Sequence, residues 1–475
     1  MKIIVRVDLV TDWGDTATVQ VDQIERPSQN LEPDLVGLSL EDGKRILSSL
    51  QQTFVRAQTD EICKLRRVCQ RCHRWIALKD YRKRKVDTVF GTVTFRSPRL
   101  ISCHCEPPYF LEVAFCPLLP IIPDRATPEL LALEAKLAAQ MSYRQVVNAM
   151  REFLPVRDTF NHVTVRNRTL RVGARIDKAE QASSIVEMAN NDAEWTLAID
   201  GGFVRDRGTE RSTTRNFEIL TGRLAAPGCK PYVFAWVRGE VSSTPTRVAD
   251  LVTAHTGSQK PKLCVITDGA NGLQSIHPQL PFRARPVLDW FHISMRVRYL
   301  EQIISGLWPK SETERFTKKL LDEYVKKLRW CFWHANSDKA QQRMSHILTL
   351  CRIVVAETPK FTQSLEQLDY RLREFFAYLK SNEGATINYG QRYRAGKPIS
   401  SAMAESAVNQ VLNARMCKNQ QMRWSPRGAH LLAQVRCAVI NGDLKARLKK
   451  YTAESVDEIS EEVRLFLEQL QRAVA

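Results

Sequence analysis

Long hydrophobic runs are missing from this sequence. Nowhere do its 475 residues form the stretch of about 18 uncharged apolar residues that a membrane-spanning helix needs. The first eight residues resemble a short strand and lack the apolar centre and small-residue cleavage site of a secretory signal. We therefore expect a cytoplasmic location and no membrane partner. Internal repeats and low-complexity tracts are also missing, and a chain of this length favours two to four domains.

Acidic residues are scarce relative to basic ones. The chain has 52 Asp and Glu against 70 Lys and Arg, which gives a formal net charge of +18. Such an excess of positive charge favours a polyanionic partner, and nucleic acid is the commonest one. The alternative is a basic soluble protein without such a partner. A membrane surface fits less well, because no basic amphipathic helix dominates the sequence.

Cysteine is present in modest number, and most of the 12 cysteines are isolated. The isolated ones resemble small buried hydrophobic residues, namely Cys229, Cys264, Cys331, Cys351 and Cys437. Four others are paired, first in Cys69-Gln-Arg-Cys72 and later in Cys103-His-Cys105. Two such pairs around a two-stranded excursion are typical of a zinc ribbon, because four thiolates complete a tetrahedron around zinc. We therefore predict a structural zinc site at these four cysteines.

The segment between the two cysteine pairs predicts a β-hairpin. Residues 87–96 alternate in polarity, and Gly91 lies near the expected turn. The second pair is Cys-x-Cys and not Cys-x-x-Cys, so other residues could replace one of these ligands. Four reduced cysteines without a metal are a further alternative. The alternative ligands are His73, His104, Cys63 and Cys116. Basic residues around the cluster favour contact with a DNA backbone: Arg66, Arg67, Arg71, Arg74, Arg82, Lys83, Arg84 and Lys85.

The next segment predicts a helix-turn-helix-like DNA-binding region. Thr127-Pro128-Glu129 marks one helix start, and Ser142 with Gln145 forms a capping box for another helix that should end by Pro155. A further helix is expected from about 163 to 176, with Val165, Thr169, Val172 and Ile176 on one face. The candidate DNA-binding residues beside that face are Arg166, Arg168, Arg171 and Arg175. A surface helix with solvated arginines is the alternative.

Two aspartates follow hydrophobic runs that are typical of buried strands. Asp200 ends the run Trp195–Ile199, and Asp268 ends the run Leu263–Thr267. From residue 195 the pattern is three strands, a helix, a strand, a helix and a strand, and this last strand ends at Asp289. That order is typical of an RNase H-like fold, in which the aspartates of the first and fourth strands are neighbours. A single aspartate in such a place would more often be a helix cap or turn former.

Phosphodiester chemistry explains why these carboxylates matter. Two Mg²⁺ ions roughly 3.5–4 Å apart can stabilise the charge on both the attacking and the leaving oxygen. Hard cations prefer oxygen ligands, so a site of this kind gathers carboxylates from separate elements. A third carboxylate is available downstream in Glu405, on the predicted helix of Ser401-Ala-Met-Ala-Glu405-Ser-Ala-Val408.

With these pieces in this order, the chain resembles a bacterial insertion-sequence transposase of the DDE type, in the ISKra-like group related to Mutator-type elements. The resemblance covers roughly residues 60–440 and includes the cysteine-rich block with Phe90-Gly91 and Ser97-Pro98-Arg99. The main matching segments are Ile199-Asp200-Gly201, Thr267-Asp268-Gly269-Ala270, Leu288-Asp289-Trp290-Phe291-His292, Glu405-Ser406-Ala407-Val408 and the run from Gln421 to Leu432.

The resemblance implies a role for each matching residue. Asp200, Asp268 and Glu405 correspond to the catalytic triad that binds two Mg²⁺ or Mn²⁺ ions. Asp289 and His292 correspond to an Asp-x-x-His signature, which we interpret as supporting groups that shape the site. Two residues that follow the catalytic helix are expected to contact DNA or orient that helix, namely Arg423 and Trp424.

The distance from Asp268 to Glu405 indicates an insertion. The 137 positions from 268 to 405 are too many for a bare RNase H-like fold, and residues 301–395 have a mostly helical pattern. This resembles the all-helical insertion that related transposases carry before the glutamate helix. We expect its tryptophans in the core, with base stacking as the alternative: Trp308, Trp330 and Trp333.

The expected fold is an α/β RNase H-like catalytic core with an all-helical insertion, preceded by two DNA-binding modules. The expected domains are a strand and helix region (1–61), a zinc-ribbon-like module (62–122), a helix-turn-helix-like region (123–180), the core's first part (190–300), the insertion (301–397), the core's second part with the Glu405 helix (398–445) and a C-terminal helix (446–475).

The resemblance predicts a DDE transposase that binds the ends of its insertion sequence and catalyses metal-dependent strand cleavage and strand transfer. Its partners would be the double-stranded DNA of the terminal repeats and the target, and the chain would be nucleoid-associated when bound. Handling two ends favours a homo-oligomer, at least a dimer. The alternatives are an RNase H-like nuclease or resolvase, and a catalytically silent DNA-binding regulator.

Overall fold

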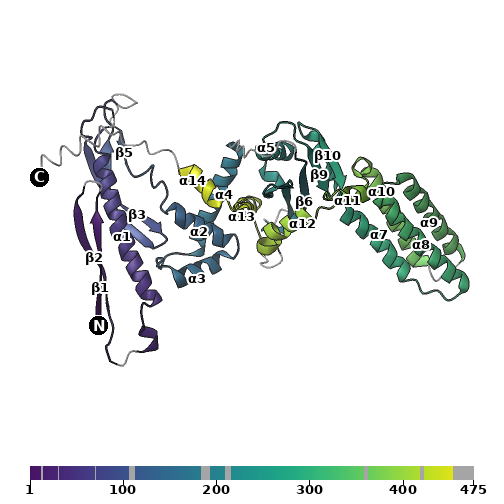
Figure 1. The fold of residues 1–475 in the computed structure, drawn as a ribbon, viewed down its shortest axis with the longest axis horizontal. Helices are drawn as coiled ribbons and strands as arrows, with labels where there is room; N and C mark the ends of the chain where they lie inside the picture. Colours follow the sequence, from purple (N-terminus) through teal and green to yellow (C-terminus); the bar gives the residue numbers. More distant parts are fainter. Residues whose placement is uncertain are drawn as a thin grey trace. The chain divides into compact units, whose positions relative to one another are not determined.

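The computed structural model divides the chain into two compact units (Figure 1). The first comprises Met1–Ala179 and the residues from Gly442, and the second comprises Glu180–Asn441. Within the described residues, no helix combines the length and the apolar character that crossing a bilayer requires. Of the C-terminal helix expected over 446–475, the part up to residue 452 is described and helical, and the part from residue 453 lies outside the described residues. The structure describes residues 1–11, 14–29, 32–69, 71–105, 113–182, 193–208, 216–357, 362–417 and 422–452.

The first unit begins with a β-hairpin and a long helix. Strands β1 (Lys2–Val10) and β2 (Thr16–Glu25) pair antiparallel, and α1 spans Leu40–Leu65. Helix α1 starts at a capping box in which Ser39 accepts the amide hydrogen of Asp42. The strand expected at the first residues and the strand and helix character expected over 1–61 agree with these elements.

A three-stranded antiparallel sheet follows, made of β3 (Leu78–Thr88), β4 (Gly91–Ile101) and β5 (Ala114–Phe115). The hairpin predicted between the cysteine pairs is confirmed as the tip of the longer β3–β4 hairpin. Gly91 adopts a φ of +104° at the turn, and an added Cβ would lie 2.8 Å from the Ser48 hydroxyl of α1. Glycine therefore suits both the turn and the close packing of α1 there.

Four helices complete the first unit. They are α2 (Pro128–Ala138), α3 (Tyr143–Phe153), α4 (His162–Ala182) and α14 (Leu444–Thr452). The predicted caps are confirmed, because Thr127 caps α2 and Ser142 forms the capping box of α3 with Gln145. The predicted apolar face of α4 is also confirmed, since its members are buried: Val165, Thr169, Val172 and Ile176.

The second unit is built on a five-stranded mixed sheet in the order β10-β9-β6-β7-β8. Its strands are β6 (Trp195–Arg205), β7 (Asn216–Ala225), β8 (Tyr232–Val237), β9 (Leu263–Thr267) and β10 (Ala284–Leu288). Helix α5 (Thr244–Thr256) joins β8 to β9, and the short α6 (Asn271–Gln274) precedes β10. This order agrees with the predicted succession of strands and helices, and the mixed α/β architecture is compatible with an RNase H-like core.

One expectation about the first strand needs correction. Asp200 was expected at a strand end, but β6 continues through it to Arg205. The reason is the antiparallel partner, because β7 stays paired with β6 from Thr196 to Arg205. Strand β9 pairs with the first half of β6 only and stops at Thr267, so Asp200 lies where the parallel neighbour ends.

The free edge of the sheet at β8 is covered by α13 (Pro426–Asn441). Its side chains bond to the strand's backbone: the Gln434 amide donates to the Ala235 carbonyl at 2.8 Å, and Asn441 exchanges two hydrogen bonds with Val233. These contacts satisfy groups that an exposed edge would offer to another strand.

A bundle of helices follows β10, and its long members lie side by side (Figure 1). The helices are α7 (Trp290–Ser305), α8 (Glu312–Trp333), α9 (Ser337–Glu357), α10 (Thr362–Ser381) and α11 (Tyr389–Arg394). The helical character predicted for 301–395 is confirmed. The expectation that its tryptophans lie in the core is wrong for Trp308 and Trp330, which are 85% and 61% exposed, whereas Trp333 packs against the core.

After the bundle the chain returns to the sheet through α12 (Ala402–Val408) and a π-helix (Asn409–Cys417). Gly202 of β6 makes this return possible, because a Cβ there would lie 2.3 Å from the Leu412 Cδ1 and 3.4 Å from the Val408 Cγ1. The absence of a side chain at Gly202 lets the helical segment lie directly on the strand.

We predict that Gly202→Val lowers the free energy of unfolding by about 1–3 kcal/mol, because the new side chain overpacks the contact with Leu412. Gly239→Val is the control, since nothing lies within 4 Å of a Cβ at Gly239. Urea unfolding of both variants measures the difference, and equal losses would contradict the packing argument.

Candidate catalytic and metal-binding sites

The parallel register of β6 and β9 brings two aspartates to the same level of the sheet. Ala198 lies opposite Ile266, so two further residues along each chain place Asp200 beside Asp268. The Asp200 Oδ1 accepts the amide hydrogen of Gly201 at 2.8 Å, and the Asp268 Oδ1 accepts that of Ala270 at 2.9 Å. Each carboxylate is oriented by the backbone and keeps its second oxygen for another partner.

Gly269 shapes the turn directly after Asp268. Its φ is +82°, and an added Cβ would lie 2.7 Å from the Leu288 Cδ1 and 2.8 Å from the Asn382 Oδ1. The hydroxyl of Tyr378, on α10, donates to the Asp268 carbonyl at 2.7 Å. The bundle thus fixes the backbone that carries Asp268, and this contact with Tyr378 was not foreseen from the sequence.

Asp289 is a buried junction between the sheet, the bundle and the return segment. It caps α7 by accepting the Phe291 amide at 2.7 Å, and its Oδ2 accepts from the His292 Nδ1 at 2.9 Å and from the Ser401 hydroxyl. Burial opposes ionisation of this carboxyl, but the hydrogen bonds from His292, Ser401 and the Phe291 amide outweigh it and lower its pKa. Asp289 thus lies within the fold, with its charge compensated by neighbours.

His292 links this junction to the aspartates. Its hydrogen bond to Asp289 raises its pKa against the opposing effect of burial, and the charges of Asp289, Asp268 and Asp200 raise the pKa further. These effects favour the charged form of His292, and the supporting role expected for this residue stays a prediction.

Glu405 lies exposed in the first turn of α12, and α12 packs against β6 and β7. Its amide donates to the Ser401 carbonyl at 2.9 Å. Ser401 occupies the N-cap position of α12 but gives its hydroxyl to Asp289 instead of capping the helix. Ser401 therefore connects the buried Asp289 to the helix that carries Glu405. The sequence pointed to it only as the residue four places before the glutamate.

The charges of Asp268 and Glu405 act on Asp200. Burial is the largest cause of the raised pKa of Asp200, and the nearby charges of Asp268 and Glu405 raise the pKa further, against the Gly201 amide and His292. A half-buried carboxylate with two acidic neighbours fits a cation, which would relieve this repulsion. The ligand atoms of the cysteine cluster all lie within 4.8 Å of one another, however, and the oxygens of these three carboxylates are not that close together in the described part of the chain.

The four predicted zinc-ligand cysteines come together in the first unit. Their sulfur atoms all lie within 4.8 Å of one another, and Cys69 is 3.3 Å from Cys105 while Cys72 is 3.4 Å from Cys103. Thiolates about 2.3 Å from a tetrahedral zinc lie roughly 3.8 Å apart, so this set fits a structural metal such as zinc. The pKa of the Cys72 thiol is lowered to about 7, and the hydrogen bond from the backbone amide of Arg74 is the largest cause.

The competing cysteines lie elsewhere. Cys63 and Cys116 pack against the cluster formed by Val86, Val93, Phe95 and Leu118, and the Cys116 sulfur is 3.0 Å from the Ser97 hydroxyl. His73 and His104 are not members of the four-residue group. The geometry therefore favours an all-cysteine set among the alternatives.

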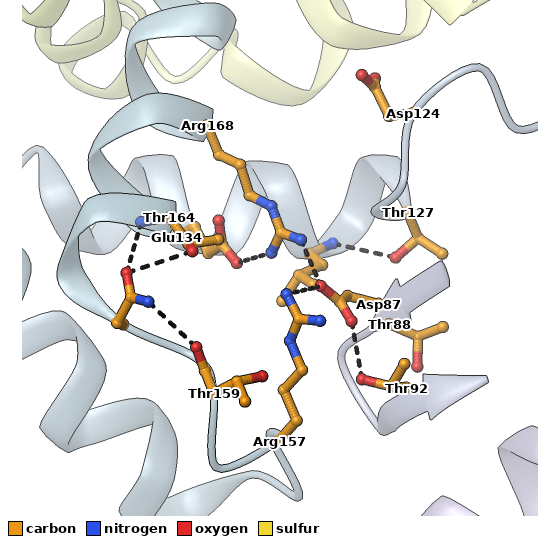
Figure 2. A network of polar contacts seen from close by, with 12 residues as sticks. Asp87, Thr88, Thr92, Asp124, Thr127, Glu134, Arg157, Thr159, Thr164 and Arg168 are labelled. Atoms are coloured by element: carbon orange, nitrogen blue, oxygen red, sulfur yellow. Dashed lines mark hydrogen bonds and ion pairs between the residues drawn. The ribbon is translucent and has the colours of Figure 1, made fainter. Parts of the chain in front are cut away.

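The basic residues predicted on α4 do not form one exposed stripe. Arg168 is 8% exposed and binds Glu134 at 2.8 Å and Asp87 at 2.5 Å, so it acts as an interior ion-pairing residue (Figure 2). Arg171 and Arg175 both pair with Asp124, and only Arg171 is largely exposed. Arg166 is exposed. The amphipathic pattern could not reveal Arg168 as interior, because its acidic partners come from other elements.

The two residues predicted after the catalytic helix differ in exposure. Arg423 is exposed, whereas Trp424 is 6% exposed and pairs through its backbone with Arg205 and Arg207 at the end of β6. The guanidinium of the buried Arg415 lies over its ring, 5.3 Å from the centroid. Of the two expected roles, DNA contact or orientation of the Glu405 helix, the buried position of Trp424 favours orientation.

Comparison with known proteins defines no family for this chain. No family model matches it, and no curated protein matches it. Among solved structures, it is similar to the Drosophila P element transposase strand transfer complex, with 11% identity over 70% of this chain and 93% of that chain and a TM-score of 0.28. A similarity this weak carries no functional argument, so the sites are judged on their own residues.

We predict that the purified chain binds one zinc ion and that Cys72→Ser abolishes this binding, because three thiolates cannot complete the tetrahedron. Cys116→Ser should retain the metal, since Cys116 packs in a separate apolar cluster. Elemental analysis after dialysis against a weak chelator measures the stoichiometry. Retention of zinc by the Cys72 variant would show that the metal lies elsewhere.

A second prediction concerns Glu134, whose burial outweighs the attraction of Arg168 and raises its pKa from 4.5 to about 7. A raised carboxyl pKa contributes stability that is full below the unfolded value and is lost as the pH rises through the folded value. Between pH 4.5 and 7, wild type should therefore lose up to about 3 kcal/mol of stability relative to Glu134→Gln.

Urea unfolding across this pH range measures the difference, and Glu129→Gln on the exposed start of α2 is the control. Parallel stability curves for wild type and Glu134→Gln would contradict the shift. The glutamine variant keeps an oxygen for the hydrogen bond from Arg168.

Proposed function

We propose that this protein is a DDE-type transposase of the bacterial insertion-sequence kind, in the ISKra-like group, which cleaves and joins DNA strands with the help of two Mg²⁺ or Mn²⁺ ions. The observation that carries the proposal is the parallel register that places Asp200 and Asp268 at one level of the sheet, with Glu405 on a helix that packs against the same strand β6. Asp200 and Asp268 share one level of the sheet, and Glu405 lies close enough to raise the pKa of Asp200.

The donor set fits hard divalent cations, because carboxylate oxygens are the ligands they prefer. Asp200, Asp268 and Glu405 would hold the metals, which when bound would stabilise charge on the attacking and leaving oxygens of the phosphodiester. Backbone amides already orient one oxygen each of Asp200 and Asp268. Those hydrogen bonds would reduce the reorganisation needed when DNA and metal arrive.

The surrounding residues would position this triad. Asp289 holds His292 and Ser401, and Ser401 begins the helix that carries Glu405. A positively charged His292 near the two aspartates would also attract the phosphate of the scissile strand. The net charge of +18 and the basic first unit suit the large phosphate surface of two element ends and a target. Joining two ends would require at least two copies of the chain.

The test uses DNA that carries the ends of the encoding element together with Mg²⁺ or Mn²⁺. Wild type should produce both cleaved ends and strand-transfer products. Asp268→Asn should lower both by about a thousandfold or more, because it removes a charge while an amide oxygen can still accept from Ala270. Asp250→Asn, an exposed carboxylate on α5, is the control and should keep full activity.

Three outcomes separate the candidate functions. Cleavage and joining that are lost only in the Asp268 variant support the transposase. Cleavage without joining would indicate an RNase H-like nuclease or resolvase. DNA binding without cleavage by either protein would indicate a regulator that has no catalytic activity.

A further inference from the structure

A cavity of about 490 Å³ lies in the first unit, between the end of β3, residues 123–126 and one face of α4. The helix contributes Thr164, Asn167, Arg168 and Arg171, which recur at the spacing of a single helical face. Five cationic side chains line the cavity against two carboxylates, so the lining carries a net excess of three positive charges. The cations are Lys85, Arg125, Arg157, Arg168 and Arg171, and the carboxylates are Asp87 and Asp124.

The acidic groups of this cavity are already engaged. The Asp87 carboxylate accepts from Arg168 and from the Thr92 hydroxyl, and it pairs with Arg157 at 3.3 Å (Figure 2). Asp124 pairs with Arg171 and Arg175. Little negative charge is therefore left to neutralise the cations at the cavity mouth.

Two of those cations have no such partner. Lys85 and Arg125 are exposed, and neither forms an ion pair with any residue that the structure describes. Arg168, fixed by Asp87 and Glu134, keeps the base of the cavity in one arrangement, so a ligand would meet a positive wall that needs little reordering. Uncompensated cations around a preformed hollow favour an anion.

We propose that this cavity binds a backbone phosphate of double-stranded DNA, with Lys85 and Arg125 as its direct contacts and the buried Arg168 as a positioning residue. A phosphodiester carries one negative charge and several acceptor oxygens, which suits ammonium and guanidinium donors from separate elements. Hairpin β3–β4 and helix α4 would then hold the same DNA backbone as one body. The inference rests on the proposed function only in taking DNA as the ligand.

The test measures binding of the full chain to a fluorescein-labelled random duplex of about 30 base pairs, by anisotropy at several salt concentrations. Lys85→Gln combined with Arg125→Gln should weaken binding about tenfold and lower the slope of log Kd against log salt by about one, as expected for one lost phosphate contact. The matched control is Lys136→Gln combined with Arg144→Gln, which removes two exposed charges from α2 and α3.

Equal weakening by both double variants would reduce the effect to net charge and overturn the proposal, as would no weakening by the cavity variant. If inorganic phosphate bound in the cavity and the cavity variant bound the duplex as wild type does, the ligand would be a free anion. That result would also overturn the proposal. Selective weakening with no strand transfer by wild type would support the phosphate site while contradicting the transposase. No duplex binding by wild type would overturn the phosphate site itself.

Discussion

The parallel pairing of β6 with β9 is the constraint on which the candidate catalytic site depends. Because both strands run in the same direction, equal steps beyond their last paired residues place Asp200 and Asp268 at one level. Burial raises the pKa of Asp200, and the neighbouring charges of Asp268 and Glu405 raise it further, so the charged form of this carboxyl is disfavoured in the fold. Glycines at 202 and 269 leave room beside these carboxylates, where any larger side chain would meet packed neighbours.

The helical bundle is anchored at the same place on the sheet. The chain leaves β10 at Asp289, and the Trp290 amide then donates to the Ile399 carbonyl, so the excursion begins and ends side by side. The Tyr389 hydroxyl donates to the Leu288 carbonyl, and Tyr378 holds the backbone of Asp268. The entropic cost of closing a loop rises only slowly with the length of the loop. A long helical segment whose two ends lie together is therefore tolerated between two parts of the candidate site.

In the first unit a buried ion network joins the β3–β4 hairpin, which the two cysteine pairs flank, to the helices. Asp87 at the end of β3 binds Arg168 of α4, and Arg168 also binds Glu134 of α2. Removing one partner of such a network leaves an uncompensated buried charge, which strongly opposes independent movement of the elements. A hairpin and a helix that look like separate DNA-binding modules in the sequence are therefore coupled, and the basic cavity lies at their junction.

Local pattern was enough to predict most elements, including the bounds of β9, the end of β10, the caps of α2 and α3, and the gathering of four cysteines into one cluster. Those features depend on neighbouring residues or on chemistry that admits few partners. Three other features depend on tertiary structure. Pairing with β7 extends β6 beyond Asp200, and ion pairs with distant carboxylates bury Arg168. The Ser401 hydroxyl donates to Asp289 and does not cap its own helix. Each outcome depends on a partner far along the chain, and such partners are set by packing, which periodicity and spacing do not encode.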